Sequence, residues 1–149
     1  MQLTDTVGSV LGNKSGEIWS VDPDASVYDA LVMMAEKDIG ALLVMRDGRL
    51  EGVLSERDYA RKVILLGKTS RETAVHEIMR HADFTVGLAA TVDECMHIMT
   101  HERVRHLPVI ENHRVIGILS IGDLVNWIIR SQEESIRHLH AYVSGSYPA

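Results

Sequence analysis

Two short stretches of the sequence carry glycine, serine and aspartate at the same spacing. They are Gly52–Asp58, which reads GVLSERD, and Gly117–Asp123, which reads GILSIGD. A serine at the start of a helix leaves backbone amides that can bind an anion, and the positive end of the helix dipole adds to this attraction. A carboxylate three residues later can accept hydrogen bonds from both hydroxyls of a ribose, the role that an acidic side chain has in dinucleotide-binding folds. This spacing therefore suits nucleotide binding.

The same residues also have an explanation that needs no ligand. Ser55 and Ser120 can each cap a helix by accepting a hydrogen bond from the amide three residues on. Asp58 and Asp123 would then lie in the first turn, where the helix dipole favours a carboxylate. Each cap is worth about 1 kcal/mol. The glycines are not required for a cap, but a glycine inside a strand often marks the close approach of a ligand or of another backbone. Both explanations can hold together.

The two stretches belong to a longer internal repeat. Residues 20–58 align without a gap with residues 85–123, at an offset of 65 positions. Two copies of one supersecondary unit most simply pack against each other about a pseudo-twofold axis, since a unit of about 60 residues buries little core alone. The identical pairs include Val21 and Val86, Val27 and Val92, Met34 and Met99, Leu42 and Leu107, and Val44 and Val109.

Composition limits the class of protein. The 149 residues are 46% hydrophobic and 24% charged, as in an ordinary globular domain. The formal net charge of −6 and the absence of a basic stripe argue against a nucleic-acid binder. The single cysteine, Cys95, cannot form an internal disulfide, which fits a reducing compartment. No leader pattern opens the sequence, and no apolar run approaches the roughly 20 residues of a bilayer span. We therefore expect a cytoplasmic protein that binds neither nucleic acid nor membrane.

Periodicity and turn signals predict the same order of elements in both copies. In the first copy we expect a strand at 18–21, a helix at 26–37, a hairpin of strands 41–45 and 50–54, and a helix from 55 to 67. In the second we expect a one-turn helix at 75–79, a strand at 84–86, a helix at 91–101, strands at 107–110 and 115–119, and a helix at 120–142. The expected domains are an N-terminal helical extension 1–13, repeats 14–67 and 74–130 joined by a linker 68–73, and a C-terminal helix extension and tail 131–149.

The duplicated junction, together with Glu77–Met79 ahead of the second copy and Val104–Val109 before its hairpin, resembles a tandem pair of CBS (cystathionine-beta-synthase) domains. The resemblance covers about residues 14–130. It implies an α+β fold of two pseudo-twofold related β-α-β-β-α repeats, each a small sheet with helices on one face. It also implies a regulatory module and not an enzyme, with two clefts that take AMP, ADP or ATP, and in some members NAD or S-adenosylmethionine.

The family's binding positions carry over to two unlike clefts. In the family the aspartate holds the ribose, the serine and its neighbours face the phosphates, and residues entering the middle strand contact the adenine edge. Arginines make the first cleft richer in charge-assisted donors, so we expect it to prefer phosphorylated ligands. Arg80 stands where the family often has threonine. The first cleft would comprise Ser55, Arg57, Asp58, Arg80, Phe84, Val104, Arg105 and His106. The second would comprise Ser120, Asp123, Trp19, Ile39, Gly40 and Ala41.

The resemblance further implies a homodimer, with the helices after Ser55 and Ser120 at the interface, that reports nucleotide occupancy to an effector protein. Two alternatives stay open. One is a homodimeric scaffold that binds no ligand. The other is a metal-dependent hydrolase using His97 and His101, which lie on one helix face but lack a companion set of ligands or a nucleophile. We expect neither a metal nor a catalytic cofactor.

Overall fold

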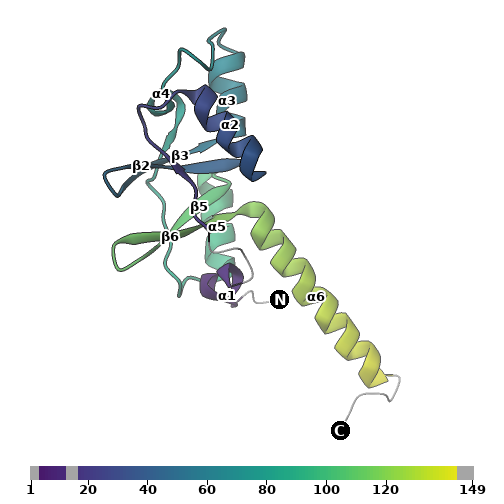
Figure 1. Cartoon of the computed structure of the whole chain (residues 1–149). Coiled ribbons are helices and arrows are strands. Elements are labelled where there is room, and N and C mark those ends of the chain that lie inside the picture. Colours follow the sequence, from purple (N-terminus) through teal and green to yellow (C-terminus); the bar gives the residue numbers. More distant parts are fainter. Residues whose placement is uncertain (1–3, 13–16, 144–149) are drawn as a thin grey trace.

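The computed structural model describes residues 4–12 and 17–143, which form two stacked halves (Figure 1). The first half contains β1 (Ser20–Val21), α2 (Val27–Lys37), β2 (Ala41–Arg46), β3 (Arg49–Ser55), α3 (Glu56–Tyr59) and the π-helical turn η1 (Ala60–Ile64). The second contains α5 (Val92–Glu102), β5 (His106–Glu111), β6 (Arg114–Ser120) and α6 (Ile121–Val143). Three further short elements are α1 (Val7–Leu11), α4 (Val75–Ile78) and β4 (Arg80–His81). The predicted α+β class and the paired hairpins are confirmed.

Local geometry repeats along the 65-residue register. Ser26 and Thr91 cap α2 and α5 by accepting hydrogen bonds from the amides of Asp29 and Glu94. Both helices end on a left-handed residue, and both hairpins carry a register shift at the same place. In the first hairpin Asp47 and Gly48 have φ of 51° and 77°, which suits the Asp-Gly turn that the sequence predicts. Equivalent positions of the two copies therefore share backbone conformation as well as residue type.

The predicted strand at 84–86 is wrong. In the first repeat the amide of Leu43 donates to the carbonyl of Trp19, and this bond extends the parallel pairing of β1 with β2. The residue equivalent to Leu43 is Pro108, which has no amide hydrogen. The pairing therefore shrinks to an isolated bridge between Val86 and Val109. The strand of this region is instead β4, which pairs with β3 and makes a four-stranded sheet in the order β1-β2-β3-β4.

Three other boundaries differ from the predictions. The first strand is shorter than 18–21, and the helix after Ser55 becomes a π-helical turn at Ala60 before Gly67, whose φ is 70°. The helix predicted within the extension 1–13 is confined to α1, and Thr6 is its cap. Residues 1–3 and 13–16 of the predicted extension and loop lie outside the described residues.

Each short helix packs on the repeat that is distant from it in sequence. The amide of Val7 in α1 donates to Ala90, and the amide of Val75 in α4 donates to Ala25. Val7 and Val10 lie in the core of the second repeat, whereas Val75 and Ile78 lie in the core of the first. A third cluster of Ala41, Leu43 and Val53, packed against Val115 and Ile118, joins the two hairpins. The halves are thus connected by reciprocal helix exchange and by a shared apolar layer.

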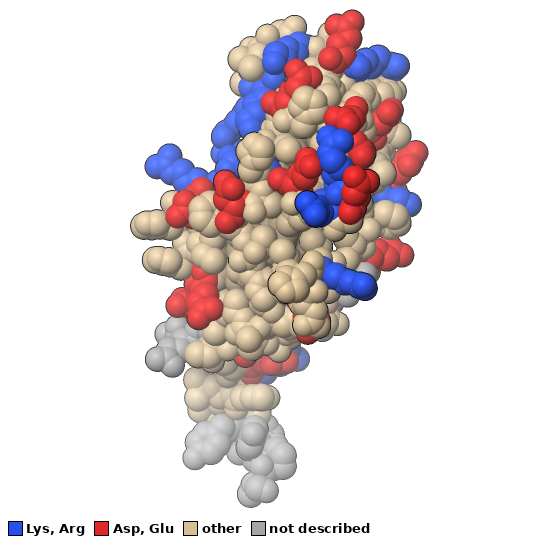
Figure 2. All heavy atoms as spheres, turned by 90° about the vertical axis from the view of Figure 1, so that its left-hand side faces the viewer, with Lys and Arg blue, Asp and Glu red and all other residues tan. Residues whose placement is uncertain are grey.

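Charge is distributed unevenly over the two halves. Figure 2 shows one face on which Lys, Arg, Asp and Glu crowd the upper part, formed by the first repeat, while the lower part is mostly uncharged. Arg46 forms an exposed pair with Asp24 at 3.0 Å, and the hydrogen bond from Arg46 holds the pKa of the Asp24 carboxyl below its usual value. None of the described helices is both long and apolar enough to cross a bilayer.

Cys95 gives a first prediction, on thiol reactivity. The residue is fully buried on α5, and desolvation, followed by the charge of Glu94, raises the pKa of its thiol to about 11. Because the thiolate is the reactive form, native protein at pH 7.5 is expected to react with a thiol reagent only at the rate of unfolding, whereas urea-unfolded protein reacts at once. The raised pKa also predicts stability that is present below pH 9 and is lost as the pH rises toward 11. Rapid stoichiometric labelling of the native protein would contradict this.

Candidate functional site

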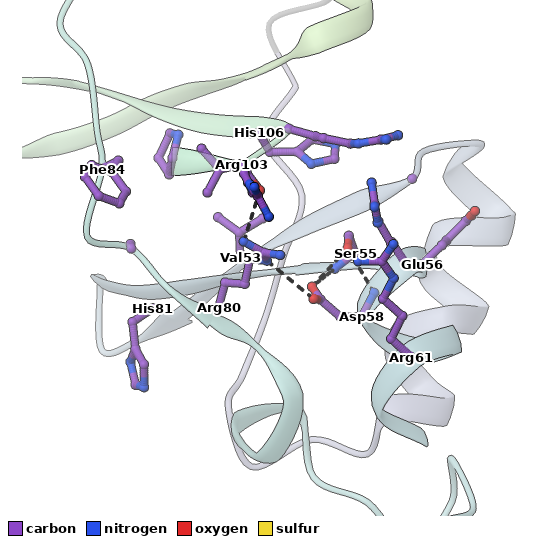
Figure 3. Close-up of a pocket in the computed structure, with 16 residues that line it drawn as sticks. Val53, Ser55, Glu56, Asp58, Arg61, Arg80, His81, Phe84, Arg103 and His106 are labelled. Atoms are coloured by element: carbon purple, nitrogen blue, oxygen red, sulfur yellow. Dashed lines mark hydrogen bonds and ion pairs between the residues drawn. The ribbon is translucent and has the colours of Figure 1, made fainter. Parts of the chain in front are cut away.

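A cavity of about 540 Å³ lies between the two halves, at the start of α3 (Figure 3). All eight residues predicted for the first cleft line it. From the first repeat it takes Gly40, Val53, Ser55, Glu56, Arg57, Asp58 and Arg61, and from β4 and the second repeat Arg80, His81, Ala82, Phe84, Arg103, Val104, Arg105, His106 and Pro108. The structure thus brings the predicted residues together from segments that are far apart in the sequence.

The predicted capping arrangement is present at the floor of the cavity. Ser55 Oγ accepts from the amide of Asp58 at 3.2 Å, and Asp58 Oδ2 accepts from both the amide and the hydroxyl of Ser55, at 3.0 and 2.9 Å. These bonds hold the Asp58 side chain in one orientation, with only 4% of the residue exposed. Ser120 and Asp123 make the equivalent backbone bonds at 3.1 and 2.8 Å. The capping role expected from the residues alone is therefore real in both repeats.

The second oxygen of Asp58 faces cations. Oδ1 lies 3.7 Å from Arg80 Nε and 3.7 Å from Lys62 Nζ. Arg80 also donates to the carbonyl of Arg103 at 3.3 Å, so its side chain crosses from the acid of one repeat to the backbone of the other (Figure 3). Lys62 in turn donates to the carbonyl of Ile78 at 3.0 Å. At 3.7 Å these contacts of Oδ1 are ion pairs and not close hydrogen bonds, in contrast to the bonds that Oδ2 accepts.

Guanidinium groups surround the open side of the cavity. Desolvation lowers the pKa of Arg57, and the neighbouring charges of Arg105, Arg61 and Arg80 lower it further. The charge of Asp58 opposes this shift without cancelling it, so the neighbouring guanidinium groups lie close enough to repel one another. Charge-assisted hydrogen bonds from arginine to phosphate or carboxylate are among the strongest that proteins make. The arrangement is therefore suited to a ligand with several negative charges.

Sequence reasoning missed two of these arginines. Arg61 lies four residues after Arg57, so a continued helix would place both on one face, and this spacing was an available signal. Arg103 occupies the left-handed position that ends α5, two residues before Arg105. Its conformation was not readable from the residue type, because arginine seldom adopts positive φ.

The second predicted cleft is only partly described. Gly40 lines the cavity around Asp58, while Trp19 and Ile39 pack against the core of the first repeat. Lys37 lies over the Trp19 ring at 4.1 Å, and Ala41 is buried. By the 65-residue register, the counterparts of residues 78–81 are residues 13–16, which lie outside the described residues. A cleft around Ser120 and Asp123 stays a prediction.

The metal alternative receives no support from the described residues. The rings of His97 and His101 stack with centroids 5.4 Å apart on α5. Within residues 4–12 and 17–143, no group of three or more His, Cys, Asp or Glu side chains is placed to hold a metal ion.

Comparison with known proteins agrees with this geometry. The family model described as CBS domain matches twice, at residues 8–64 and 75–130. The chain belongs to the CBS domain family. A tandem CBS pair supports a regulatory or signalling module. The arrangement of two pseudo-equivalent repeats with the cavity between them is the CBS architecture expected from the sequence.

Individual relatives are similar over most of the CBS pair. The mitochondrial CBS domain-containing protein CBSX3 of Arabidopsis thaliana is 38% identical over 135 residues, covering 87% of this chain but 65% of that protein's length. A solved CBS-domain protein from Burkholderia ambifaria is 45% identical with a TM-score of 0.81, covering 85% of this chain and 96% of that one. The CBS-domain containing protein ATU1752 of Agrobacterium tumefaciens is 36% identical with a TM-score of 0.76, covering 81% and 97%.

Proposed function

We propose that the chain is a regulatory module that binds an adenosine nucleotide in the Asp58 cavity and signals occupancy to a partner protein. One observation carries this proposal. A capped helix start and arginines from both repeats line the same cavity, whose volume is about 540 Å³. The arginines provide charge-assisted donors for a phosphate, and the positive end of the helix dipole adds to the attraction. A polyphosphate would place negative charge beside Arg57, whose pKa is lowered by desolvation and then by the charges of the neighbouring arginines.

Asp58 is the proposed ribose contact. Its Oδ2 is committed to Ser55, whereas Oδ1 has cations at 3.7 Å and can accept from the ribose hydroxyls if Arg80 turns toward the phosphates. AMP, ADP, ATP, NAD and S-adenosylmethionine all carry this ribose, so the acid alone does not choose among them. The arginines favour the ligands with phosphate groups. Phe84, 38% exposed at the rim, offers an apolar surface for the base.

Signalling follows if the ligand binds two arrangements of the repeats with different affinity. Arg80 connects Asp58 to the backbone of Arg103, so a ligand that displaces it would change a contact between the repeats. A coupling of about 1–3 kcal/mol is sufficient to alter partner binding. We propose that the responding unit is a homodimer with the helices after Ser55 and Ser120 at the interface. Exposed Ile64, Leu65 and Leu66, next to the first of these helices, supply apolar surface for such a contact.

A thermal-shift panel tests the binding. Native protein is titrated with AMP, ADP, ATP, NAD, NADH and S-adenosylmethionine, and a ligand at a hundredfold excess over its dissociation constant is expected to stabilise the fold by about 2.7 kcal/mol. Asp58→Asn keeps an acceptor for the cap while removing the charge, and is expected to abolish that stabilisation. Asp123→Asn is the matched variant in the other repeat and is expected to retain it.

Two results would contradict the proposal. Absence of a shift with every ligand would favour the scaffold that binds no ligand. Equal loss of the shift in both aspartate variants would contradict the assignment of the dominant site to the Asp58 cavity.

A further inference from the structure

The last helix extends well beyond the repeat that it completes. The start of α6 packs on the second repeat through Leu124, Trp127 and Ile128, and Trp127 Nε1 donates to Asp5 at 2.8 Å. Every residue from Gln132 to His140 is exposed, and Figure 1 shows this part projecting from the body. A helical segment of this length is marginal in water unless another surface packs against it.

One face of α6 carries a heptad pattern. Ile129, Ile136 and Val143 follow each other at intervals of seven and correspond to position a, while Val125, Gln132 and Leu139 correspond to position d. At 3.6 residues per turn these six side chains fall within an arc of about 80°. Five of them are apolar and exposed, with exposed fractions of 41% for Val125, 48% for Ile129, 67% for Ile136, 65% for Leu139 and 76% for Val143. We call these six residues the α6 seam.

The seam lies beside the face that packs on the body: at 3.6 residues per turn, Ile128 of that face is about 20° from Leu139 at the edge of the seam. Leu124 is fully buried and Trp127 and Ile128 are partly buried, on the side of the helix that faces the second repeat. Arg130, Glu134 and Arg137 lie on the side opposite the seam and are exposed. The residues of α6 that face the body are already packed, so an additional exposed apolar stripe on the same helix indicates a second packing partner.

We propose that the α6 seam pairs with the same seam of a second copy of this chain, as a parallel two-stranded coiled coil. The three a positions hold β-branched residues and the d positions include Leu139, the combination that favours two parallel strands. This inference deepens the self-association proposed above by naming the segment and its orientation. It does not depend on nucleotide binding.

Gln132 supports the parallel orientation. In a parallel pair each layer joins identical positions, so Gln132 meets the partner copy's equivalent glutamine, and two amides can each donate and accept. A fully overlapped antiparallel pair would place Gln132 against an isoleucine and bring the two copies of Glu133 close together. A polar residue at one core position of a coiled coil is a known determinant of register, and like charges at the flank oppose the antiparallel arrangement.

Cysteine cross-linking tests the orientation. Leu139→Cys places thiols at a shared layer of the parallel pair, whereas Glu134→Cys places them on the opposite side of the helix. Under mild oxidation without nucleotide, the Leu139 variant is expected to form mostly covalent dimer, and the Glu134 variant less than a tenth as much. The buried native Cys95 should leave wild-type protein uncross-linked. Equal cross-linking of the two variants, or none at position 139, would overturn the proposal.

Sedimentation of Ile136→Asp tests the contribution of the seam. The variant is expected to raise the dimer dissociation constant at least tenfold while leaving the thermal midpoint of the monomer unchanged, because Ile136 lies beyond the packed part of α6. An unchanged dissociation constant, or a wild-type protein that is monomeric at 100 µM, would overturn the proposal. The nucleotide-induced thermal shift of the same variant is measured in parallel, so failure of the seam and failure of nucleotide binding are distinguished.

Discussion

Gly52→Ala is expected to lower the free energy of unfolding by about 3 kcal/mol, the upper end of the usual range for forcing extra atoms into a packed site. A Cβ at position 52 would collide with the carbonyl oxygen of Arg80 and would lie 2.9 Å from the sulfur of Met79. The nearest atom is backbone and cannot rotate away, so β4 must move off β3. The pairing of Gly52 with His81 and of Val53 with Arg80 would weaken, and with it a connection between the repeats.

Two glycines of the same chain provide graded controls. At Gly117 the nearest atom is Leu11 Cδ2 at 3.1 Å, the end of a flexible side chain, so Gly117→Ala should cost less than Gly52→Ala. At Gly40 a Cβ meets nothing within 4 Å, so Gly40→Ala should be neutral or slightly stabilising. Thermal melts are expected to show a decrease of about 6–12 °C for Gly52→Ala. If Gly40→Ala lowered the melting temperature equally, the loss of stability would come from the loss of glycine's backbone flexibility and not from the contact with Arg80.

These glycines show which part of the packing can be predicted from the sequence. A glycine inside a strand signals that something approaches the backbone, and the sequence left open whether that is a ligand or another segment. In the structure it is β4 at Gly52 and α1 at Gly117. The partners could not be read from the sequence, because the 65-residue register relates equivalent positions and says nothing of which helix crosses to which repeat.

The serine and aspartate of the repeated junction were more informative. Capping follows from local spacing, so the bonds between Ser55 and Asp58 could be predicted from seven residues. The pairing partners of Asp58 outside its own turn could not. Arg80 reaches it through β4, whose existence depends on the long-range pairing with β3. The arginine cluster is a tertiary property, although four of its members lie within two short stretches of sequence.

The arginine cluster also gives the largest expected effect on binding. Replacing both Arg57 and Arg105 by alanine is expected to weaken a triphosphate ligand by at least a hundredfold, since each charge-assisted hydrogen bond is worth about 1.5–3 kcal/mol. Adenosine, which has no phosphate, should bind wild type and variant about equally. Calorimetric titration of adenosine, AMP and ATP against both proteins measures this difference, and the wild-type preference for ATP should fall as salt is raised.

The single substitution Arg57→Ala should not destabilise the protein in the absence of ligand. Arg57 is held in a site where desolvation and the charges of Arg105, Arg61 and Arg80 lower its pKa, so removing it relieves repulsion in the unliganded state. The unliganded thermal midpoint of Arg57→Ala is therefore expected to be unchanged or higher, while the rise produced by ATP is lost. Arg49→Ala, which removes an exposed arginine from the first hairpin, is the matched control and should change neither quantity. A variant at Arg57 that melts earlier without ligand yet keeps its response to ATP would show that the cluster serves the fold and not the ligand. A functional cluster differs from a structural one in this respect, because its repulsion costs stability until an anion is bound.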